Sequence, residues 1–295
     1  MDTSDLRIFE AVARLGGMNR AAAELNTVQS NVTARIRHLE AQLGETLFQR
    51  HSRGVALTPA GDRLLPYARR ACRLIDEARR AVADDGRPKG DLVIGSLETT
   101  AAVRLPEVLA TYASAYPEVD LVLRPATSAE LIEDVLAYRI EGAFVCGPVD
   151  HPDLVEEPVF TEELVLLTSR RVARLEDLAH DPRLKIVVMR VGCSYRQKLE
   201  ALLAGKGIVG LRRLEFGTID GIVGAVGAGL GISLLPRSVV AAAARDGRVA
   251  LHALPQGDAA VATVFVRRRD AFVSSALSAF LDHARPVPSH AAAAE

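Results

Sequence analysis

Residues 18–43 read MNRAAAELNTVQSNVTARIRHLEAQL, and this stretch holds two short helical patterns joined at a tight corner. In its second half, apolar residues recur at steps of four, three and four, at Val32, Ile36, Leu39 and Leu43. That spacing stacks them on one face of an α-helix, which we expect to be buried in a core. The preceding residues 20–25 are nearly all alanine, and alanine lets two helices cross closely at the corner marked by Asn26 and Thr27. The stretch therefore predicts a helix-turn-helix.

The other face of the second helix is polar and carries small hydroxyl and amide side chains together with arginine. A face of this kind fits the major groove of DNA, and Gln29 at the start of the helix is placed for a bidentate contact with adenine. The residues predicted to contact DNA from this helix are Gln29, Ser30, Asn31, Thr33, Arg35 and Arg37. An amphipathic helix pair in an ordinary domain would show the same periodicity, so the prediction depends on the residues after the second helix.

The next residues predict a small β-hairpin. Residues 47–50 and 55–58 are short strand-like runs, and residues 51–54 between them are turn formers. A hairpin in this position forms a wing beside the helix, from which we expect Arg50 and Arg53 to reach phosphates or the minor groove. The alternative is that these two arginines are ordinary solvated surface.

From residue 20 to residue 61 the sequence RAAAELNTVQSNVTARIRHLEAQLGETLFQRHSRGVALTPAG resembles the DNA-binding head of LysR-type transcriptional regulators. The match runs without a gap, which makes it specific, unlike a lone short motif. It implies a winged helix-turn-helix over residues 1–58 and a double-stranded DNA operator as partner. The chain departs from the family's usual serine at Val28 and usual alanine at Asn31. The expected cap of the recognition helix therefore moves to Thr27, and the base preference near Asn31 stays open.

Charge is spread unevenly along the chain. The 295 residues carry a net charge of -1, yet between residues 20 and 80 eleven arginines face six acids. A basic head on an acidic body suits a DNA-binding module with a separate sensing domain, because phosphate attraction is needed at one end only. The composition, 49% hydrophobic and 25% charged, is ordinary for a globular chain of two or three compact units.

A long amphipathic helix is predicted over residues 59–85. Thr58 can cap it, and Pro59 suits its first position. Apolar residues recur along it in alternating steps of four and three, at Leu64, Ala68, Ala71, Ile75, Ala78 and Val82. This line of apolar residues, the seam, is narrow, as in a coiled coil. A helix that packs on its own domain usually has a broader apolar face. We therefore expect the seam to join two copies of the chain, so that two recognition helices read two half-sites.

Two glycines and a proline in residues 86–90 interrupt the helix and predict a hinge. Over residues 91–295, short apolar runs alternate with amphipathic helices, which predicts a parallel sheet with helices on both faces. Two such runs in tandem resemble the periplasmic-binding-protein-like sensor of LysR regulators, which is built from two Rossmann-like α/β lobes. In that sensor the last strand and helix return to the first lobe. Lobe I is thus expected at residues 91–161 and 266–290, and lobe II at residues 162–265.

A ligand is expected at the carboxyl ends of the strands, where helix N-termini offer free N–H groups to an anion. The residues predicted to line a cleft between the lobes are Ser96, Glu98, Thr99, Thr100, Thr127, Ser128, Ser194, Tyr195, Arg196 and Thr218. Any single serine or threonine among them could equally be only a helix cap. Arg196, at a helix start, is expected to pair with a carboxylate. Glu98 either holds a ligand's amino group or points outward and stabilises a helix N-terminus.

The sequence shows no catalytic or metal-binding pattern. Cys72, Cys146 and Cys193 are odd in number and far apart, so they predict neither a disulfide framework nor a zinc site. The seven histidines have no metal-ligand spacing. Residues 224–231 are glycine-rich, but they come late in a helix and lack a P-loop lysine, so we expect a structural turn. Without a nucleophile, base and orienting group together, we expect no enzyme, no metal and no cofactor.

No charged and apolar leader follows the acidic start of the chain, and no apolar run is long enough to span a bilayer. We expect a cytoplasmic protein without a membrane partner. The features together predict a sequence-specific bacterial transcription regulator that responds to a small, carboxylate-bearing effector. The resemblance implies a homotetramer built as a dimer of dimers, and allows RNA polymerase as a partner. A receptor that acts through protein partners is an alternative, but it would not explain the basic N-terminal domain. An architectural DNA-binding protein is another, but it would give the two C-terminal lobes no function.

Overall fold

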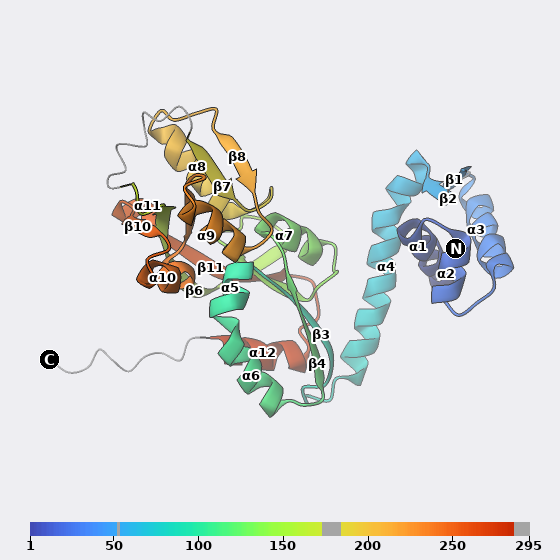
Figure 1. Cartoon of the computed structure of the whole chain (residues 1–295). Helices are drawn as coiled ribbons and strands as arrows, with labels where there is room; N and C mark the ends of the chain where they lie inside the picture. The colour runs from blue at the N-terminus through green and yellow to red at the C-terminus, as the bar shows by residue number, and fades with distance from the viewer. Residues whose placement is uncertain (52–53, 173–183, 286–295) are drawn as a thin grey trace. The chain divides into compact units, whose positions relative to one another are not determined.

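The computed structural model describes residues 1–51, 54–172 and 184–285. The chain forms two compact units, Met1–Asp85 and Gly86–Glu295 (Figure 1). The boundary lies at the start of the segment predicted to be a hinge. Gly86 and Gly90 in that segment have φ angles of 84° and 81°, which glycine adopts without strain.

The first unit begins with three short helices and a two-stranded hairpin, namely α1 (Thr3–Leu15), α2 (Met18–Glu24), α3 (Gln29–Leu43), β1 (Phe48–His51) and β2 (Gly54–Leu57). Local signals set several of these boundaries. α1 starts with a capping box between Asp2 and Asp5 and ends at Gly16 in the left-handed conformation. The corner between α2 and α3 contains Asn26 with a φ of 50°, a region that asparagine tolerates better than most residues. The predicted helix-turn-helix and hairpin are both present.

The core of this head forms largely where the periodicity of α3 predicts it. Val32, Ile36 and Leu39 are at most 2% exposed, and they belong to the same buried cluster as Ala21 of α2 and Phe9 of α1. The close helix crossing expected from the alanines is therefore real, because Ala21 is fully buried between the helices.

Two expectations about α3 are wrong. Leu43, predicted to be buried, is 39% exposed at the last residue of the helix. The residue that caps α3 is Val28, which offers no side-chain hydrogen bond, rather than Thr27. The Thr27 hydroxyl instead accepts a hydrogen bond from Asn31 Nδ2 at 2.9 Å, so it holds a side chain and not a backbone N–H.

Helix α4 (Pro59–Ala83) starts as predicted, with Thr58 Oγ1 accepting from the Gly61 N–H at 3.1 Å. The predicted seam along it is divided between two environments. Ala68 is fully buried, and with Cys72 it packs into the core of its own head. Leu64 and Ala71 pack partly against the same core. Ala68 therefore cannot join a second copy, because helix α1 of its own chain already covers that face.

A neighbouring face of α4 carries the apolar residues that are left exposed. Tyr67 is 73% exposed, Leu74 62% and Val82 90%. Ala71 and Ala78 lie between them at steps of three and four, so the five residues share one face. We call this set, Tyr67, Ala71, Leu74, Ala78 and Val82, the α4 stripe. It keeps Ala71, Ala78 and Val82 of the predicted seam and lacks the buried Ala68 and the half-buried Leu64 and Ile75.

The described part of the second unit contains β3 (Gly90–Ser96), α5 (Glu98–Val103), α6 (Leu105–Ala115), β4 (Val119–Pro125), α7 (Ser128–Leu136), β5 (Gly142–Cys146), β6 (Leu154–Thr168), β7 (Lys185–Val188), α8 (Ser194–Gly205), β8 (Arg212–Glu215), α9 (Ile219–Gly227), β9 (Ser233–Pro236), α10 (Arg237–Arg245), β10 (Ala250–Ala253), α11 (Gln256–Ala259), β11 (Ala260–Arg268) and α12 (Ser275–Ala284). Every residue of β5 is buried, as expected for a strand covered on both faces.

The sheet is mixed, so the prediction of a parallel sheet is only partly right. β3 pairs in parallel with β4 and β5, and β7 pairs in parallel with β8. β11, however, runs antiparallel to both β5 and β6, and β6 runs antiparallel to β9 and β10. The main path through the sheet is β10-β6-β11-β5-β3-β4. A β-α-β pattern predicts the direction of successive strands within a lobe, but it says nothing of strands that cross between lobes.

β6 and β11 are the two crossing strands, and the predicted lobe boundaries at 161/162 and 265/266 fall inside them. Lobe I contains β3 to β5, α5 to α7 and α12, and lobe II contains β7 to β10 with α8 to α10 (Figure 1). α12 packs against α6 and β3, so the last helix does return to the first lobe. One buried cluster, including Tyr112, Phe265 and Phe280, fills this side of lobe I, and another runs from α7 into lobe II.

Candidate functional site

The first candidate surface is the polar face at the start of α3. Gln29, Ser30 and Asn31 are exposed there, and Thr33 is half-buried. Gln29 Nε2 donates to Thr33 Oγ1 at 3.0 Å, as Asn31 Nδ2 does to Thr27 Oγ1. Within the described structure neither amide oxygen has a protein donor, so both oxygens can accept a hydrogen bond from a base edge.

The arginines predicted for this surface have different positions. Arg37 is exposed on α3. Arg35 does not fit a DNA contact, because its Nη1 donates to Asp5 at 2.9 Å and to Asp2 at 3.2 Å, which ties α3 to the start of α1. Arg53 lies outside the described residues, and the side chain of Arg50 is likewise not described. The wing contacts therefore stay predictions.

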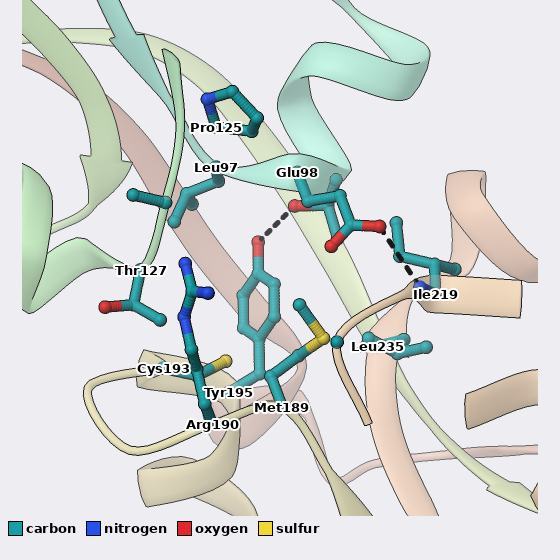
Figure 2. A pocket seen from close by; sticks show the side chains of 13 residues that line it. Leu97, Glu98, Pro125, Thr127, Met189, Arg190, Cys193, Tyr195, Ile219 and Leu235 are labelled. Atoms are coloured by element: carbon teal, nitrogen blue, oxygen red, sulfur yellow. Dashed lines mark hydrogen bonds between the residues drawn. The ribbon is translucent and has the colours of Figure 1, made fainter. Parts of the chain in front are cut away.

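The second candidate site is a cavity of about 360 Å³ between the two lobes (Figure 2). Lobe I contributes residues from the start of α5 and the segment after β4, namely Leu97, Glu98, Thr99, Pro125, Ala126 and Thr127. Lobe II contributes residues from the segment after β7, the starts of α8 and α9, and β9, namely Met189, Arg190, Cys193, Tyr195, Gly217, Ile219 and Leu235. We call this cavity the cleft. Its volume suits a small molecule.

Two hydrogen bonds cross the cleft from α5 to lobe II. The hydroxyls of Thr99 and Tyr195 lie 3.4 Å apart. Glu98 Oε1 accepts the backbone N–H of Ile219, the first residue of α9, at 3.1 Å. The carboxylate of Glu98 thus occupies the N-terminus of a helix in the opposite lobe, where negative charge is favoured.

A third link lies at the other side of the cleft. Glu130 Oε2 accepts from the Thr127 N–H at 2.9 Å and from Arg190 Nη2 at 3.1 Å. The backbone N–H and hydroxyl of Thr127, together with the nearby Arg190 guanidinium, hold the pKa of the Glu130 carboxyl below its usual value. Thr127 is consequently both a helix cap and part of the cleft wall, so the two interpretations of this residue are compatible.

Below the cleft the lobes are in close contact. Ser194 Oγ donates to Ser128 Oγ at 3.0 Å, and Ser128 Oγ also accepts from the Cys146 N–H at 3.2 Å. Gly192, with a φ of 93°, packs so closely that a Cβ there would lie 2.8 Å from Thr127 Oγ1. A side chain at this position would push the lobes apart.

Of the ten residues predicted to line the cleft, the structure brings Glu98, Thr99, Thr127 and Tyr195 together on its wall. Ser128 and Ser194 hold the lobes together instead. Ser96 is fully buried and its hydroxyl donates to the Leu97 carbonyl, and Thr100 is only 3% exposed. Thr218 is exposed and accepts from the Gly221 N–H, so it is a helix cap.

Arg196 is the main correction, because it does not line the cleft. Its Nη1 donates to Glu215 at 3.0 Å and its Nε donates to Glu200 at 3.3 Å. Two carboxylates of its own lobe thus satisfy this guanidinium, which leaves it poorly suited to hold a ligand's carboxylate. The arginine that lines the cleft is Arg190.

Sequence reasoning missed Arg190 together with the apolar wall residues Leu97, Pro125, Met189 and Leu235. Arg190 follows strand β7 almost directly, at the carboxyl end where a ligand is expected. The rule that ligands bind at the carboxyl ends of strands could have identified Arg190, if it had been applied to the residues directly after β7 rather than to the start of the next helix. The apolar residues carry no comparable signal, because any core has many like them.

The cleft offers binding groups rather than a reactive centre. Burial raises the pKa of the Cys193 thiol and of the Tyr195 hydroxyl, so both stay protonated near neutral pH. Gly231, the last residue of the glycine-rich stretch 224–231, has no room for a side chain, because a Cβ there would lie 2.4 Å from the Lys185 carbonyl oxygen. No cluster of metal-binding side chains occurs among the described residues. Within that same part of the chain, no helix has the length and apolarity to cross a bilayer.

Comparison with known protein families gives two matches that together span nearly the whole chain. Residues 3–62 match the model of the bacterial regulatory helix-turn-helix protein of the lysR family. Residues 85–288 match the model of the LysR substrate binding domain.

Similar individual proteins agree with these matches. The chain is 45% identical to the HTH-type transcriptional regulator GltR of Bacillus subtilis, with 97% of this chain and 96% of that protein covered. It is 42% identical to the regulator YofA of Bacillus velezensis, with 98% and 99% covered. Among solved structures, full-length CbnR in complex with its target DNA has a TM-score of 0.64 at 26% identity, covering 96% of this chain and 99% of that one. Full-length OxyR of Pseudomonas aeruginosa shares the fold, with a TM-score of 0.71 at 19% identity, covering 98% and 96%.

Proposed function

The chain belongs to the LysR family of DNA-binding transcriptional regulators, which carry an effector-binding domain and are not enzymes, and we propose how this member works. It binds an operator as a dimer through α3, and a small carboxylate-bearing effector in the cleft changes that binding. It acts in the cytoplasm, where its operator is. The tetramer and the contact with RNA polymerase are further expectations of the resemblance.

The DNA-binding part of the proposal rests on the exposed amides of α3 and on the α4 stripe. Gln29, Asn31 and Thr33 present acceptors and a hydroxyl at the start of a helix, which is the region that enters the major groove in helix-turn-helix proteins. CbnR, which shares this fold, has been solved with its target DNA. Tyr67, Leu74 and Val82 leave an apolar line along α4 that a second copy would cover.

The single observation that carries the effector proposal is Arg190 on the wall of the cleft. Its side chain is 54% exposed, and one of its amino groups bonds Glu130 of the opposite lobe. A ligand carboxylate can take the remaining donors in a charge-assisted pair. Because Arg190 and Glu130 belong to different lobes, such a ligand would change the link between them. A ligand shifts a regulator only if it favours one arrangement over another.

The test is a thermal-shift screen of small carboxylates on the full-length protein, since a ligand that binds only the folded state raises the melting temperature. An operator selected from random DNA then reports the effect on DNA affinity. Arg190→Ala is expected to remove the shift and the response while operator affinity without effector stays within about threefold. Arg196→Ala is the matched control and is expected to keep the response.

The reverse outcome, in which Arg196→Ala loses the response and Arg190→Ala keeps it, would restore the sequence-based assignment of Arg196. A screen in which no carboxylate raises the melting temperature would contradict the proposed effector class.

A further inference from the structure

We propose that the effector is a zwitterion, whose protonated amine is held by Glu98 while its carboxylate is held by Arg190. This inference rests on the proposed function and narrows the class of effector from carboxylates to amino acids and their close analogues. It is carried by the positions of two opposite charges in one cavity.

The cleft wall contains one acid and one base. Of its lining residues, Glu98 and Arg190 are the charged ones, and they come from opposite lobes. Figure 2 shows them on opposite sides of the Tyr195 ring, whose hydroxyl lies close to that of Thr99. Other parts of the cleft wall are apolar and include Leu97, Met189 and Leu235. A ligand that carries one charge of each sign on a short carbon frame matches a wall with these groups.

Glu98 is only partly satisfied by the protein. Its Oε1 accepts the Ile219 N–H at 3.1 Å, and in the described structure the second oxygen has no protein donor. Glu98 is half-buried and this oxygen is not shut off from solvent, so a donor or a cation in the cleft can reach it. A ligand ammonium group can supply both the charge and the hydrogen bond.

The same contact excludes the alternative place for a ligand's carboxylate. The N-terminus of α9 would be a natural anion site, but the Glu98 carboxylate already takes the first N–H of that helix. A second anion there would meet a like charge. Arg190, beyond Tyr195, is therefore left to bind the ligand's acid, while the region around Glu98 attracts a cation.

The experiment measures binding to the full-length protein by calorimetry for matched triplets of compounds. One triplet is norvaline, pentanoate and butylamine, and another is leucine, 4-methylpentanoate and 3-methylbutylamine. In each, the second compound lacks the α-amine of the first and the third lacks the α-carboxylate. We expect at least one amino acid to bind tenfold or more tightly than both of its partners.

Glu98→Gln is the informative variant. Its amide oxygen can still accept from the Ile219 N–H, so the link between the lobes is kept while the charge is removed. We expect the preference for the amino acid over its deaminated partner to fall to within about twofold. Binding of the deaminated acid should stay the same or improve, which a merely misfolded variant would not show.

The outcomes separate this inference from the proposed function. If deaminated acids bind as tightly as the amino acids, or if Glu98→Gln keeps the preference, the zwitterion assignment is wrong while the carboxylate effector stands. If neither acids nor amino acids bind, both are wrong. If the amines bind as tightly as the amino acids, Arg190 has no role in binding and both assignments fail again.

Discussion

Helix α3 and the cleft differ in how their functional residues are distributed along the chain. On α3, the residues predicted to contact DNA lie within positions 29–37 of one helix. In the cleft, the lining residues come from five separate segments between Leu97 and Leu235. Periodicity predicts neighbours on one helix face from local geometry, and on α3 it identified the buried residues Val32, Ile36 and Leu39. It cannot predict which strand end faces which helix across a cavity.

Helix α4 is an intermediate case, because periodicity predicted only part of its arrangement. Its heptad-like spacing is real, but α1 covers one part of the predicted seam and leaves another face exposed. The periodicity identified the helix and its apolar character. Packing within the head then decided which apolar residues stay available for a second copy.

The largest effect is expected from Leu74→Asp, which places a carboxylate in the middle of the α4 stripe. If two copies meet there, like charges without partners face each other and the dimer dissociates. Losing the second half-site contact should weaken operator binding about 100-fold or more. Sedimentation velocity and DNA titration at fixed salt measure the two effects. Val209→Asp, at a valine that is 76% exposed elsewhere, is the control. A Leu74→Asp variant that stays dimeric would show that the α4 stripe is not the interface.

A smaller effect should distinguish Arg35 from Arg37 on the same helix. Arg35→Ala leaves the carboxylate of Asp5, which is 2% exposed, without its cation, and should lower the free energy of unfolding more than Arg37→Ala does. Arg37→Ala should leave stability within about 0.5 kcal/mol. It should instead lower the slope of log affinity against log salt by about one. Denaturant unfolding and salt titrations check both. An Arg35→Ala variant with unchanged stability and a lower salt slope would return Arg35 to the DNA surface.

The smallest effect is expected from Val28→Ser. Val28 caps α3 without a side-chain acceptor, so a serine hydroxyl there can accept one of the free N–H groups of the first turn. The variant should be more stable by about 1 kcal/mol, seen as a higher melting temperature of the head. Val28→Ala removes the exposed valine without adding an acceptor and is the control. Equal melting temperatures for the two variants would mean that Thr27 or water already accepts hydrogen bonds from the free N–H groups at this end of the helix.

Much of the fold was accessible from the sequence alone because it depends on neighbours along the chain. The cap at Thr58 and the buried stripe of Val32, Ile36 and Leu39 follow from the order and spacing of nearby residues. The family resemblance supplied the order of the modules. The antiparallel direction of β6 and β11 was not accessible, because a β-α-β pattern does not record which strands cross between lobes.

Which groups reach the cleft was decided by the tertiary structure. Arg190 and Arg196 both lie near the start of α8, and sequence offers little reason to prefer one as the ligand's partner. In the fold, Glu200 and Glu215 neutralise Arg196, whereas Arg190 faces the opposite lobe. Glu98 similarly acquires its role only when α9 of the other lobe lies against it. The sequence gives the charge of each side chain. Its partners depend on distances between segments that are far apart in the chain, and only folding determines those distances.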